Sequence, residues 1–413
     1  MKDVVYDVIV IGGGASGMMA GGVAGANGKS VLLLEKNKNL GEKLKISGGG
    51  RCNITNAEED IHKFLKFYED SEDFLYSPFS QFKNSDTFAF FEQKNLPLVT
   101  QARKRVFPKT ERALDVFNVL KKYMDKGGVK VQSNTTVLKI LSEGKRIIGV
   151  ETKQGAFHAK SFILATGGVS HPETGSTGDG FKWLKDLGHT VKEPTPTIVP
   201  LRTKDHWVHV LKGVSLKNVK INFYLDDKKQ FGSKGDILCT HFGLSGPLIL
   251  NSAKKVADLL HSGIVTAKID AYPSIDTGEL EKKIIKIFDS NKNKILKNIV
   301  NEFAPIGTLN GLQVLFKDID FNKKVHSITK EERKSIAQGL KALPVIIEGL
   351  MGYDRAVVAD GGVILTEIDT KTMCSKLYEN LYITGDLLHI TRPTGGFSLQ
   401  LCWTTGYVAG MNV

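Results

Sequence analysis

The start of the chain carries a clear hydrophobic pattern. Residues 5–11 are mostly apolar and end directly in glycines, which is typical of a strand buried on both faces of a parallel sheet. Residues 15–27 are small and compatible with a helix, and residues 31–34 form a second apolar run that ends at Glu35. The pattern predicts a strand, a glycine turn, a helix, and a second strand followed by an acidic residue.

Helical and strand-like patterns alternate through the next part of the chain. The predicted helices cover residues 88–93 and 113–126, and the predicted strands cover residues 129–131, 137–141, 147–152 and 161–165. The last of these strands is apolar throughout and runs directly into two glycines. This segment therefore continues the pattern of a parallel sheet with covering helices.

The pattern changes after residue 193. Residues 193–200 contain three prolines, which favours an extended linker. From there to residue 275 short alternating strands predominate, and a lysine-rich helical pattern follows. We predict an α/β fold: a Rossmann-like nucleotide-binding domain with a mostly parallel sheet, split by an inserted domain. The first domain would comprise residues 1–193 and 345–413, and the inserted domain would be β-rich over 194–275 and mainly helical over 276–344.

Composition places the 413-residue chain among ordinary globular proteins. Hydrophobic residues make up 41% and charged residues 24%, which argues against extensive disorder. No apolar run approaches the roughly 18–20 residues that a membrane-spanning helix needs, and the N-terminus lacks the features of a signal peptide. We therefore expect a cytoplasmic location and no membrane span.

The formal net charge of +12 raises the question of a nucleic-acid partner. The lysines are scattered, with local clusters at residues 103–105 and 281–297, and no zinc-finger or RNP-type motif accompanies them. A solvated basic surface that favours anionic ligands is the preferred interpretation, and nucleic acid is an unlikely partner. The four cysteines form no C-x-x-C pair, so we expect neither a disulfide framework nor a metal site.

The first motif with chemical meaning is GGGASG at residues 12–17, which satisfies G-x-G-x-x-G between a strand and a helix. Gly12 permits a tight turn, Gly14 allows the backbone to approach a pyrophosphate, and Gly17 lets the helix pack against the strand. The helix N-terminus offers N–H groups to phosphates. Glu35 is placed to accept hydrogen bonds from ribose hydroxyls, so the motif predicts dinucleotide binding.

Three further segments distinguish FAD from NAD. GEKLKISGGGRCN at 41–53 can wrap an anionic ligand through its backbone amides, with Lys43 and Arg51 adding charge. ATGG at 165–168 and LYITGD at 381–386 are apolar strands that end in glycine turns. Each segment alone is compatible with an ordinary turn, but their joint occurrence in this order favours FAD.

Longer segments are similar to one known family. The chain resembles the BaiN/YhiN-like family of FAD-dependent oxidoreductases, within the glutathione-reductase-type FAD superfamily, at residues 41–56, 105–120, 240–247, 360–376 and 394–400. The similarity extends over essentially the whole chain. The family includes sequences labelled bile-acid-intermediate reductases and others labelled aminoacetone oxidases.

The resemblance implies FAD contacts at matching positions. These comprise Gly12, Gly14, Ala15, Ser16, Gly17, Glu35, Lys36, Lys43, Ser47, Gly48, Arg51, Cys52, Asn53, Val137, Ala165, Thr166, Gly167, Gly385, Asp386, Gly395, Gly396 and Phe397. The last three would meet the isoalloxazine. If a helix begins there, its N-terminus would stabilise negative charge on the reduced flavin.

One region departs from the family pattern. After Asp386 the chain continues LLHITRP, whereas many relatives carry an acidic residue and a glycine in this stretch. Phe397-Ser398 stands where relatives carry Tyr-Asn. Because this region would lie near the flavin ring, the resemblance leaves the substrate open.

Candidates for acid–base catalysis are few. His241 and His389 are weak candidates, since a structural role or a hydrogen-bonding role in the wall of the site is the preferred interpretation for each. His171, in a glycine-rich loop, is expected to face the cofactor or to order that loop rather than to transfer a proton. Cys52 has no partner cysteine nearby, which disfavours a disulfide-reductase mechanism. A second G-x-G-x-x-G on its own strand–helix unit is absent. Either NAD(P)H binds transiently over the flavin, or electrons come from the substrate and leave to oxygen or another acceptor.

The leading hypothesis is an FAD-dependent oxidoreductase that reduces an activated C=C bond of a hydrophobic small molecule, with NAD(P)H as donor. One alternative is an amine or aminoketone oxidase that uses oxygen. Another is a nucleic-acid-binding flavoprotein that uses the basic insertion. The oligomeric state stays open.

Overall fold

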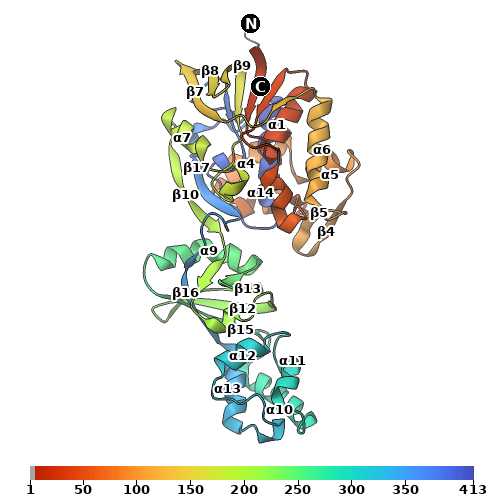
Figure 1. The fold of residues 1–413 in the computed structure, drawn as a ribbon, viewed down its shortest axis with the longest axis vertical. Coiled ribbons are helices and arrows are strands. Elements are labelled where there is room, and N and C mark those ends of the chain that lie inside the picture. Colours follow the sequence, from red (N-terminus) through yellow and green to blue (C-terminus); the bar gives the residue numbers. More distant parts are fainter. Residues whose placement is uncertain (1–4) are drawn as a thin grey trace. The chain divides into compact units, whose positions relative to one another are not determined.

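The computed structural model describes residues 5–413, which form two compact units (Figure 1). The first unit runs to Thr195 and resumes at Val358, and the second comprises Pro196–Val357. Each unit has its own cluster of buried hydrophobic residues. No helix within residues 5–413 is long and apolar enough to cross a membrane.

A seven-stranded sheet forms the centre of the first unit. In order across the sheet the strands are β6 (Lys130–Gln132), β2 (Val31–Leu34), β1 (Val5–Ile11), β9 (Gly155–Leu164), β8 (Arg146–Thr152) and β7 (Val137–Glu143), and β18 (Leu381–Ile383) also pairs with β9. Pairing is parallel from β6 to β9 and between β9 and β18, and antiparallel from β9 to β7. The predicted α/β fold with a mostly parallel sheet is confirmed.

Two helices in this unit approach each other unusually closely. A Cβ atom on Gly406 of α14 (Phe397–Met411) would lie 2.5 Å from the carbonyl oxygen of Ser16 in α1 (Ala15–Ala26). Gly410, one turn further along α14, approaches α1 to the same degree. Because only glycine lacks a Cβ atom, these two positions allow the helix backbones to touch.

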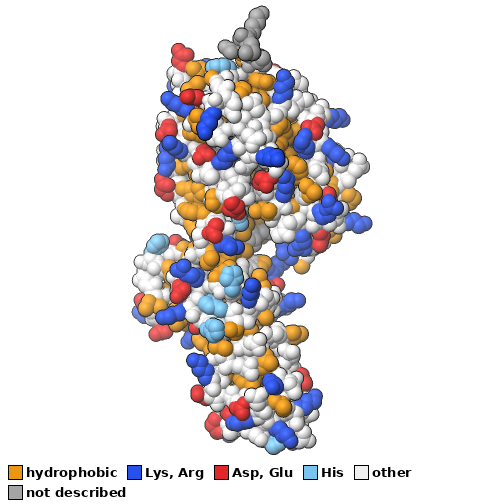
Figure 2. Space-filling model, viewed as in Figure 1, with side chains coloured by type: hydrophobic (Ala, Val, Ile, Leu, Met, Phe, Trp, Pro, Cys, Tyr) orange, Lys and Arg blue, Asp and Glu red, His pale blue; other side chains and the backbone are white. Residues whose placement is uncertain are grey.

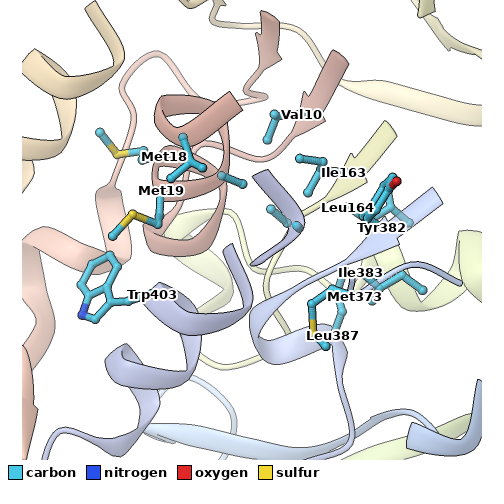
Figure 3. Close-up of a cluster of buried hydrophobic side chains, with 14 of the residues drawn as sticks. Val10, Met18, Met19, Ile163, Leu164, Met373, Tyr382, Ile383, Leu387 and Trp403 are labelled. Atoms are coloured by element: carbon cyan, nitrogen blue, oxygen red, sulfur yellow. The ribbon is translucent and has the colours of Figure 1, made fainter. Parts of the chain in front are cut away.

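The buried cluster around these helices is almost entirely apolar (Figure 3). Methionines of α1 and a tryptophan of α14 lie beside the central strands, with Val10, Met18, Met19, Ile163, Leu164, Ile383 and Trp403 all at most 2% exposed. The indole N–H of Trp403 donates to the carbonyl oxygen of Ile54 at 3.0 Å. Burial of this size fixes α1, and with it the glycine turn at its N-terminus.

The remaining elements of the first unit surround the sheet. The helices are α2 (Glu42–Ile46), α3 (Ile61–Leu65), α4 (Glu72–Gln81), α5 (Asn84–Glu92), α6 (Ala113–Lys126) and α7 (Asp179–Asp186). A small antiparallel sheet contains β3 (Thr55–Asn56), β5 (Arg105–Pro108) and β4 (Leu98–Gln101). The amphipathic pattern gave α6 its correct bounds.

The second unit contains a closed barrel. Its strands are β11 (Leu201–Thr203), β14 (Gly243–Ser245), β13 (Lys228–Thr240), β12 (Ser215–Leu225), β15 (Val265–Asp270) and β16 (Leu343–Leu350). Its helices are α8 (His206–His209), α9 (Pro247–Leu260), α10 (Thr277–Ser290), α11 (Val300–Phe303), α12 (Leu309–Leu315) and α13 (Lys330–Lys341). Asp276 and Thr329 form capping boxes that define the starts of α10 and α13.

The boundaries of the units differ from the predicted ones. The chain returns from the second unit to the first between residues 357 and 358, whereas the prediction placed this return between 344 and 345. The reason is β16, which pairs with β15 and β11 and so completes the barrel. The proline-rich linker expected at 193–200 overlaps a strand, since β10 (Val191–Ile198) pairs with β17 (Val358–Val363).

The segment DGGVILTEIDTKTMCSK at residues 360–376 contributes two side chains to a buried series of hydrogen bonds. His189 Nδ1 lies 2.8 Å from the Glu367 carboxylate, and its Nε2 lies 3.0 Å from the Ser375 hydroxyl. That hydroxyl also accepts the backbone N–H groups of Leu377 and Tyr378. Burial lowers the pKa of His189 although Glu367 opposes this, so the imidazole is neutral and its role is structural.

Candidate cofactor site

The glycine turn between β1 and α1 has no room for side chains at two positions. A Cβ atom on Gly12 would lie 2.5 Å from the carbonyl oxygen of Ala165, and one on Gly17 would lie 1.9 Å from that of Gly12. At Gly14, by contrast, nothing lies within 4 Å of such an atom. The turn therefore presents bare backbone and the first N–H groups of α1 to open space, which suits a pyrophosphate.

Glu35 lies beside this turn at the end of β2. Its carboxylate accepts the backbone N–H of Gly13 at 2.7 Å and that of Asn37 at 2.8 Å. The side chain is buried, and these two bonds fix its orientation. A carboxylate has further lone pairs, so Glu35 can also accept ribose hydroxyls. The backbone N–H of Thr135 donates to the backbone carbonyl oxygen of Glu35 at 2.9 Å, so the segment that leads to Val137 and β7 passes beside Glu35.

A loop at residues 170–179 is attached to the same edge. Lys36 Nζ lies 2.8 Å from Asp179 Oδ2 and contacts Thr177, and the Asn37 amide donates to the carbonyl oxygen of Thr174 at 2.9 Å. Within the loop, His171 Nδ1 lies 2.8 Å from a Glu173 carboxylate oxygen. The resemblance implied that Lys36 contacts FAD, and in this structure its ammonium group also holds the loop.

The segment Ser47–Gly50 offers a second stretch of bare backbone. Gly48, Gly49 and Gly50 all have positive φ angles, and a Cβ atom on either of the last two would meet nothing within 4 Å. The Oδ1 atom of Asn53 is buried and accepts no hydrogen bond from any residue in 5–413. Because buried acceptors are normally satisfied, Asn53 is suited to a donor on a bound cofactor.

The other residues of this segment have different roles. Cys52 is fully buried, and burial raises the pKa of its thiol to about 12, so it stays protonated and unreactive. Arg51 pairs with Glu111 at 3.3 Å, and its guanidinium lies 4.6 Å from the centre of the Phe107 ring. The structure thus directs Arg51 toward the surface of the small sheet.

The carboxyl ends of the central strands converge at this site. Thr384, after β18, donates to the carbonyl oxygen of Leu164 at 3.2 Å. A Cβ atom on Gly385 would lie 3.0 Å from the Ser16 hydroxyl, and one on Gly167 would lie 3.0 Å from the hydroxyl of Ser176. Ala165, Thr166 and Gly167 therefore lie at the same sheet edge as α1, which is where open α/β sheets bind ligands.

A buried charge network lies next to Gly167 and Gly168 at this edge. Asp386 pairs with Arg392 through one carboxylate oxygen and with Lys43 Nζ at 3.2 Å through the other. The Arg392 side chain is 1% exposed and also donates to the Ile390 carbonyl at 2.7 Å and to the Ser398 hydroxyl at 3.2 Å. Burial by itself would raise the pKa of Asp386, but Arg392 and Lys43 outweigh it and hold that pKa below its ordinary value.

Arg392 and Ser398 were missed as site residues. The departure from the family pattern after Asp386 pointed to this stretch, but nothing in the sequence pairs residue 392 with residue 386 or 398. The network carries two cations and one anion, so its net charge is positive. It lies against the first turn of α14, because Ser398 belongs to that turn.

A helix does begin after Gly395-Gly396, and it is α14. Gly396 caps it with φ of 104°, and a Cβ atom there would lie 2.2 Å from the carbonyl oxygen of Thr55. The Phe397 ring is 2% exposed and packs on Phe67 at 4.6 Å between centroids. Its side chain thus belongs to an aromatic cluster, and the backbone is the part of this turn suited to meeting an isoalloxazine.

The two histidine candidates belong to different units. His241 is exposed in the turn between β13 and β14, where its ring lies 4.9 Å from that of Phe242. His389 is partly buried in the first unit, and its backbone N–H donates to Val363 at 3.0 Å. The two candidates thus lie in different units, and no acid–base role is assigned to either.

Comparisons with known proteins agree with this geometry. The family model described as the HI0933-like protein Rossmann domain matches residues 6–412. The chain is 27% identical over 405 residues to the 3-dehydro-bile acid delta(4,6)-reductase of Clostridium scindens, with 97% of each chain covered. It is also 27% identical over 410 residues to the ribosomal RNA dihydrouridine synthase of Haemophilus influenzae, with 98% of each covered.

A solved structure supports the fold. The open conformation of a flavocytochrome c3 fumarate reductase matches with a TM-score of 0.57 at 16% identity, covering 100% of this chain and 78% of that one. The open backbone at Gly14, the oriented Glu35 and the buried acceptor of Asn53 fit FAD. FAD is the cofactor, and the protein is an oxidoreductase. The chain belongs to the HI0933-like Rossmann-domain family of FAD-binding enzymes.

Proposed function

We propose that this enzyme reduces a C=C bond conjugated to a carbonyl group, with NAD(P)H as the electron donor. One observation carries the proposal. Two relatives aligned over nearly the whole chain have names that describe such a reduction, in a 3-oxo bile acid and in the uracil ring of RNA. These different substrates share the same chemistry, which argues that the reaction type belongs to the common FAD scaffold.

The net reaction is balanced by a simple exchange. A hydride reaches the carbon β to the carbonyl, a proton reaches the α carbon, and NAD(P)H is oxidised to NAD(P)⁺. FAD, when bound, supplies the chemistry that accepts a hydride from the donor and passes it to the substrate. The protein must hold both partners and stabilise charge.

The residues proposed to lie near the flavin ring, here called the ring end, are Lys43, Asp386, Arg392 and the first turn of α14. They are suited to stabilising charge. The N-terminus of α14 and the net positive charge of Lys43, Asp386 and Arg392 both favour an anion at this end of the site. Asp386 is paired with two cations, so it is ionised and accepts rather than donates hydrogen bonds. Cys52 stays a thiol and takes no part in electron transfer.

The donor is expected to bind transiently. The glycine-rich residues 175–180 follow the short helical turn Pro172–Thr174 and lead into α7, so they do not extend a parallel strand. They are part of the loop held by Lys36 and Asn37. This arrangement does not provide a second dinucleotide site of the β1–α1–β2 kind.

An anaerobic absorbance titration of the FAD-loaded protein with NADH and then NADPH tests the donor. Bleaching of the flavin band by either nucleotide is the expected result. A flavin that stays oxidised with both, but is bleached by an aminoketone, would replace this proposal with an amine oxidase that passes electrons to oxygen.

A second candidate substrate is a uracil base within RNA. The second unit carries 25 lysines and arginines against 17 aspartates and glutamates, so it holds most of the net charge of the chain. Such a surface favours a polyanion. Titration with a fluorescent uridine-rich oligonucleotide at low and physiological salt tests it. Binding that persists near physiological salt supports this candidate, and its loss leaves a small hydrophobic enone as the substrate class.

A further inference from the structure

The outer face of the barrel in the second unit carries a group of basic side chains. In β12 the side chains of Ile221 and Phe223 are fully buried, so the positions that alternate with them lie on the outer face. The register of β13 and β15 places further residues beside these positions. We call this surface the basic face, and it consists of Lys220, Asn222, Tyr224, Gly232, Lys234 and Lys268. In the view of Figure 2, lysine and arginine side chains lie over the region that Figure 1 labels β12 and β13.

Two lysines stand directly opposite each other on the basic face. Lys220 of β12 pairs in register with Lys234 of β13, and like charges in such positions destabilise a sheet. The other cross-strand neighbour of Lys220 is Asp270, whose carboxylate lies 2.8 Å from Lys341 Nζ. Within residues 5–413 neither of the two opposed lysines makes an ion pair or a side-chain hydrogen bond. Their repulsion is therefore relieved only by an anion from outside the chain.

Tyr224 places an aromatic ring among these lysines. Its side chain is partly exposed, and the Lys268 ammonium group lies 5.1 Å from the centre of its ring. The strand that carries it is paired on both sides, by β13 and β15, so the ring stands on a rigid base. An aromatic ring on such a surface, with basic side chains beside it, is suited to stacking on the bases of a single-stranded nucleic acid.

The centre of the basic face holds an acceptor without a donor. Asn222 Oδ1 is buried, and no residue within 5–413 donates a hydrogen bond to it. The carboxamide lies over Gly232, where a Cβ atom would come within 2.4 Å of Oδ1. Buried acceptors are normally satisfied, so this position is suited to a donor from a ligand. The neighbouring side chains at 220 and 268 are long and flexible, so they can turn aside to admit one.

We infer that the basic face binds single-stranded RNA. Lys220 and Lys234 bind phosphates, because such contacts supply most of the affinity for a nucleic acid. Tyr224 stacks on a base, and Asn222 Oδ1 accepts the hydrogen of a ribose 2′-hydroxyl. DNA lacks that hydroxyl, so the Asn222 acceptor selects RNA. The inference rests on the uracil-in-RNA candidate of the proposed function, because it identifies the surface that holds such a substrate.

The main test measures the fluorescence anisotropy of a short uridine-rich RNA with the FAD-loaded protein over a range of salt concentrations. The double variant Lys220→Ala/Lys234→Ala removes the opposed pair. Its control, Lys282→Ala/Lys286→Ala, removes two exposed lysines of α10 and changes the net charge by the same amount. Flavin absorbance and the melting temperature show that each variant is folded.

We expect K220A/K234A to weaken RNA binding tenfold or more at low salt. The slope of log K against log salt should also fall by about 1.4, since each phosphate contact on a single strand contributes about 0.7. K282A/K286A should bind like the unmodified protein. Equal losses in the two double variants would reduce the effect to net charge, and an unchanged affinity in K220A/K234A would exclude the basic face as the RNA site.

Single variants test the two uncharged contacts. Tyr224→Ala should weaken RNA binding several-fold, whereas Tyr224→Phe keeps the ring and should bind normally. Asn222→Ala should lose the preference for RNA over DNA of the same sequence while its affinity for DNA stays unchanged. A preference for RNA that survives in N222A would contradict the role given to this acceptor.

A vesicle assay separates RNA from an anionic membrane. If phosphatidylglycerol vesicles bind the protein through Lys220 and Lys234 while RNA does not bind, a membrane surface replaces RNA and the inference is overturned. All these measurements record binding without turnover. Failure to reduce a uracil in bound RNA would therefore end the RNA candidate of the proposed function, whereas the anisotropy data would still decide whether the basic face binds RNA.

Discussion

The part of the cofactor site suited to the phosphates and the part proposed for the flavin ring use different chemical groups, backbone in one and side chains in the other. The phosphate end consists of backbone: Gly12, Gly14 and Gly17 position a turn and a helix N-terminus, and one side chain, Glu35, is fixed by two backbone N–H groups. The part proposed to lie near the flavin ring consists of side chains: Arg392 connects Asp386 and Ser398, and Asp386 also pairs with Lys43.

This difference separates the groups that bind the cofactor from the groups that set the electrostatic potential around it. A site made of backbone presents the same donors whatever the surrounding side chains are, so it suits a group that every member of a family binds. A site made of paired charges changes its potential whenever one partner changes. We therefore expect changes at the ring end to alter stability and charge together, and changes at the phosphate end to act through steric fit.

The largest effect is expected at Arg392. Replacement by glutamine in R392Q leaves a buried carboxylate with Lys43 alone, and breaking a buried ion pair costs about 3–5 kcal/mol. The free energy of unfolding from urea titration measures this loss. The exposed pair of Arg146 and Glu379 provides the control, because R146Q should cost at most about 1 kcal/mol. Equal small losses in both variants would show that the network contributes no stability.

The glycine turn is expected to divide into two kinds of position. G17A forces a Cβ atom against the Gly12 carbonyl, so we expect a loss of about 1–3 kcal/mol in unfolding free energy. G14A meets nothing in the protein and should fold normally, yet lose tenfold or more in FAD affinity because its methyl group enters the cofactor space. Calorimetry and FAD titration separate the two effects. A G14A protein that keeps full affinity would move the pyrophosphate away from Gly14.

Acid should weaken the fold through the buried chain at His189. Its folded pKa is lowered by burial, so the unfolded chain takes up a proton first as the pH falls through about 6.5. Burial opposes ionisation of Glu367, but its hydrogen bonds to Thr190 and His189 lower its pKa, so its contribution is complete above pH 4.5 and is lost in stronger acid. Urea midpoints should therefore fall from pH 7 to pH 5, and less steeply in H189N. An unchanged slope in that variant would exclude His189 as the cause.

The smallest effect is expected at the loop of residues 170–179, which Lys36 and Asn37 hold. Asp179→Asn weakens a partly exposed ion pair with Lys36, worth about 0.2–1 kcal/mol. The loop should open more often, and FAD should dissociate a few-fold faster while the melting temperature stays nearly constant. Stopped-flow displacement of FAD measures the rate. If the rate is unchanged, the loop does not cover the cofactor.

Features that depend on neighbouring residues could be predicted from the sequence, whereas features that depend on distant residues could not. The strand, glycine turn and helix at the start of the chain, and the helix over residues 113–126, follow from patterns in which each residue acts on near neighbours. These elements are local, so periodicity and turn residues are sufficient to place them.

Other features depend on contacts between distant residues. Most of β16 lies in the part of the sequence that was assigned to the first domain, yet it completes the barrel because β15 and β11 lie on either side of it. The prolines near residue 194 suggested a linker, but β17 supplies a pairing partner. Arg392 belongs with Asp386 and Ser398 only because the turn after β18 folds against α14. Such pairings leave no periodic trace in the sequence.

The most direct test of the central claim is an anaerobic half-reaction. The flavin is first reduced under argon, and a 3-oxo-4-ene steroid carboxylate is then added while the flavin band and the products are followed. We predict that the oxidised band returns and that one saturated ketone forms for each flavin. A flavin that stays reduced with this enone and with uridine-containing substrates, while an aminoketone reduces the oxidised enzyme, would contradict the assignment as a C=C reductase.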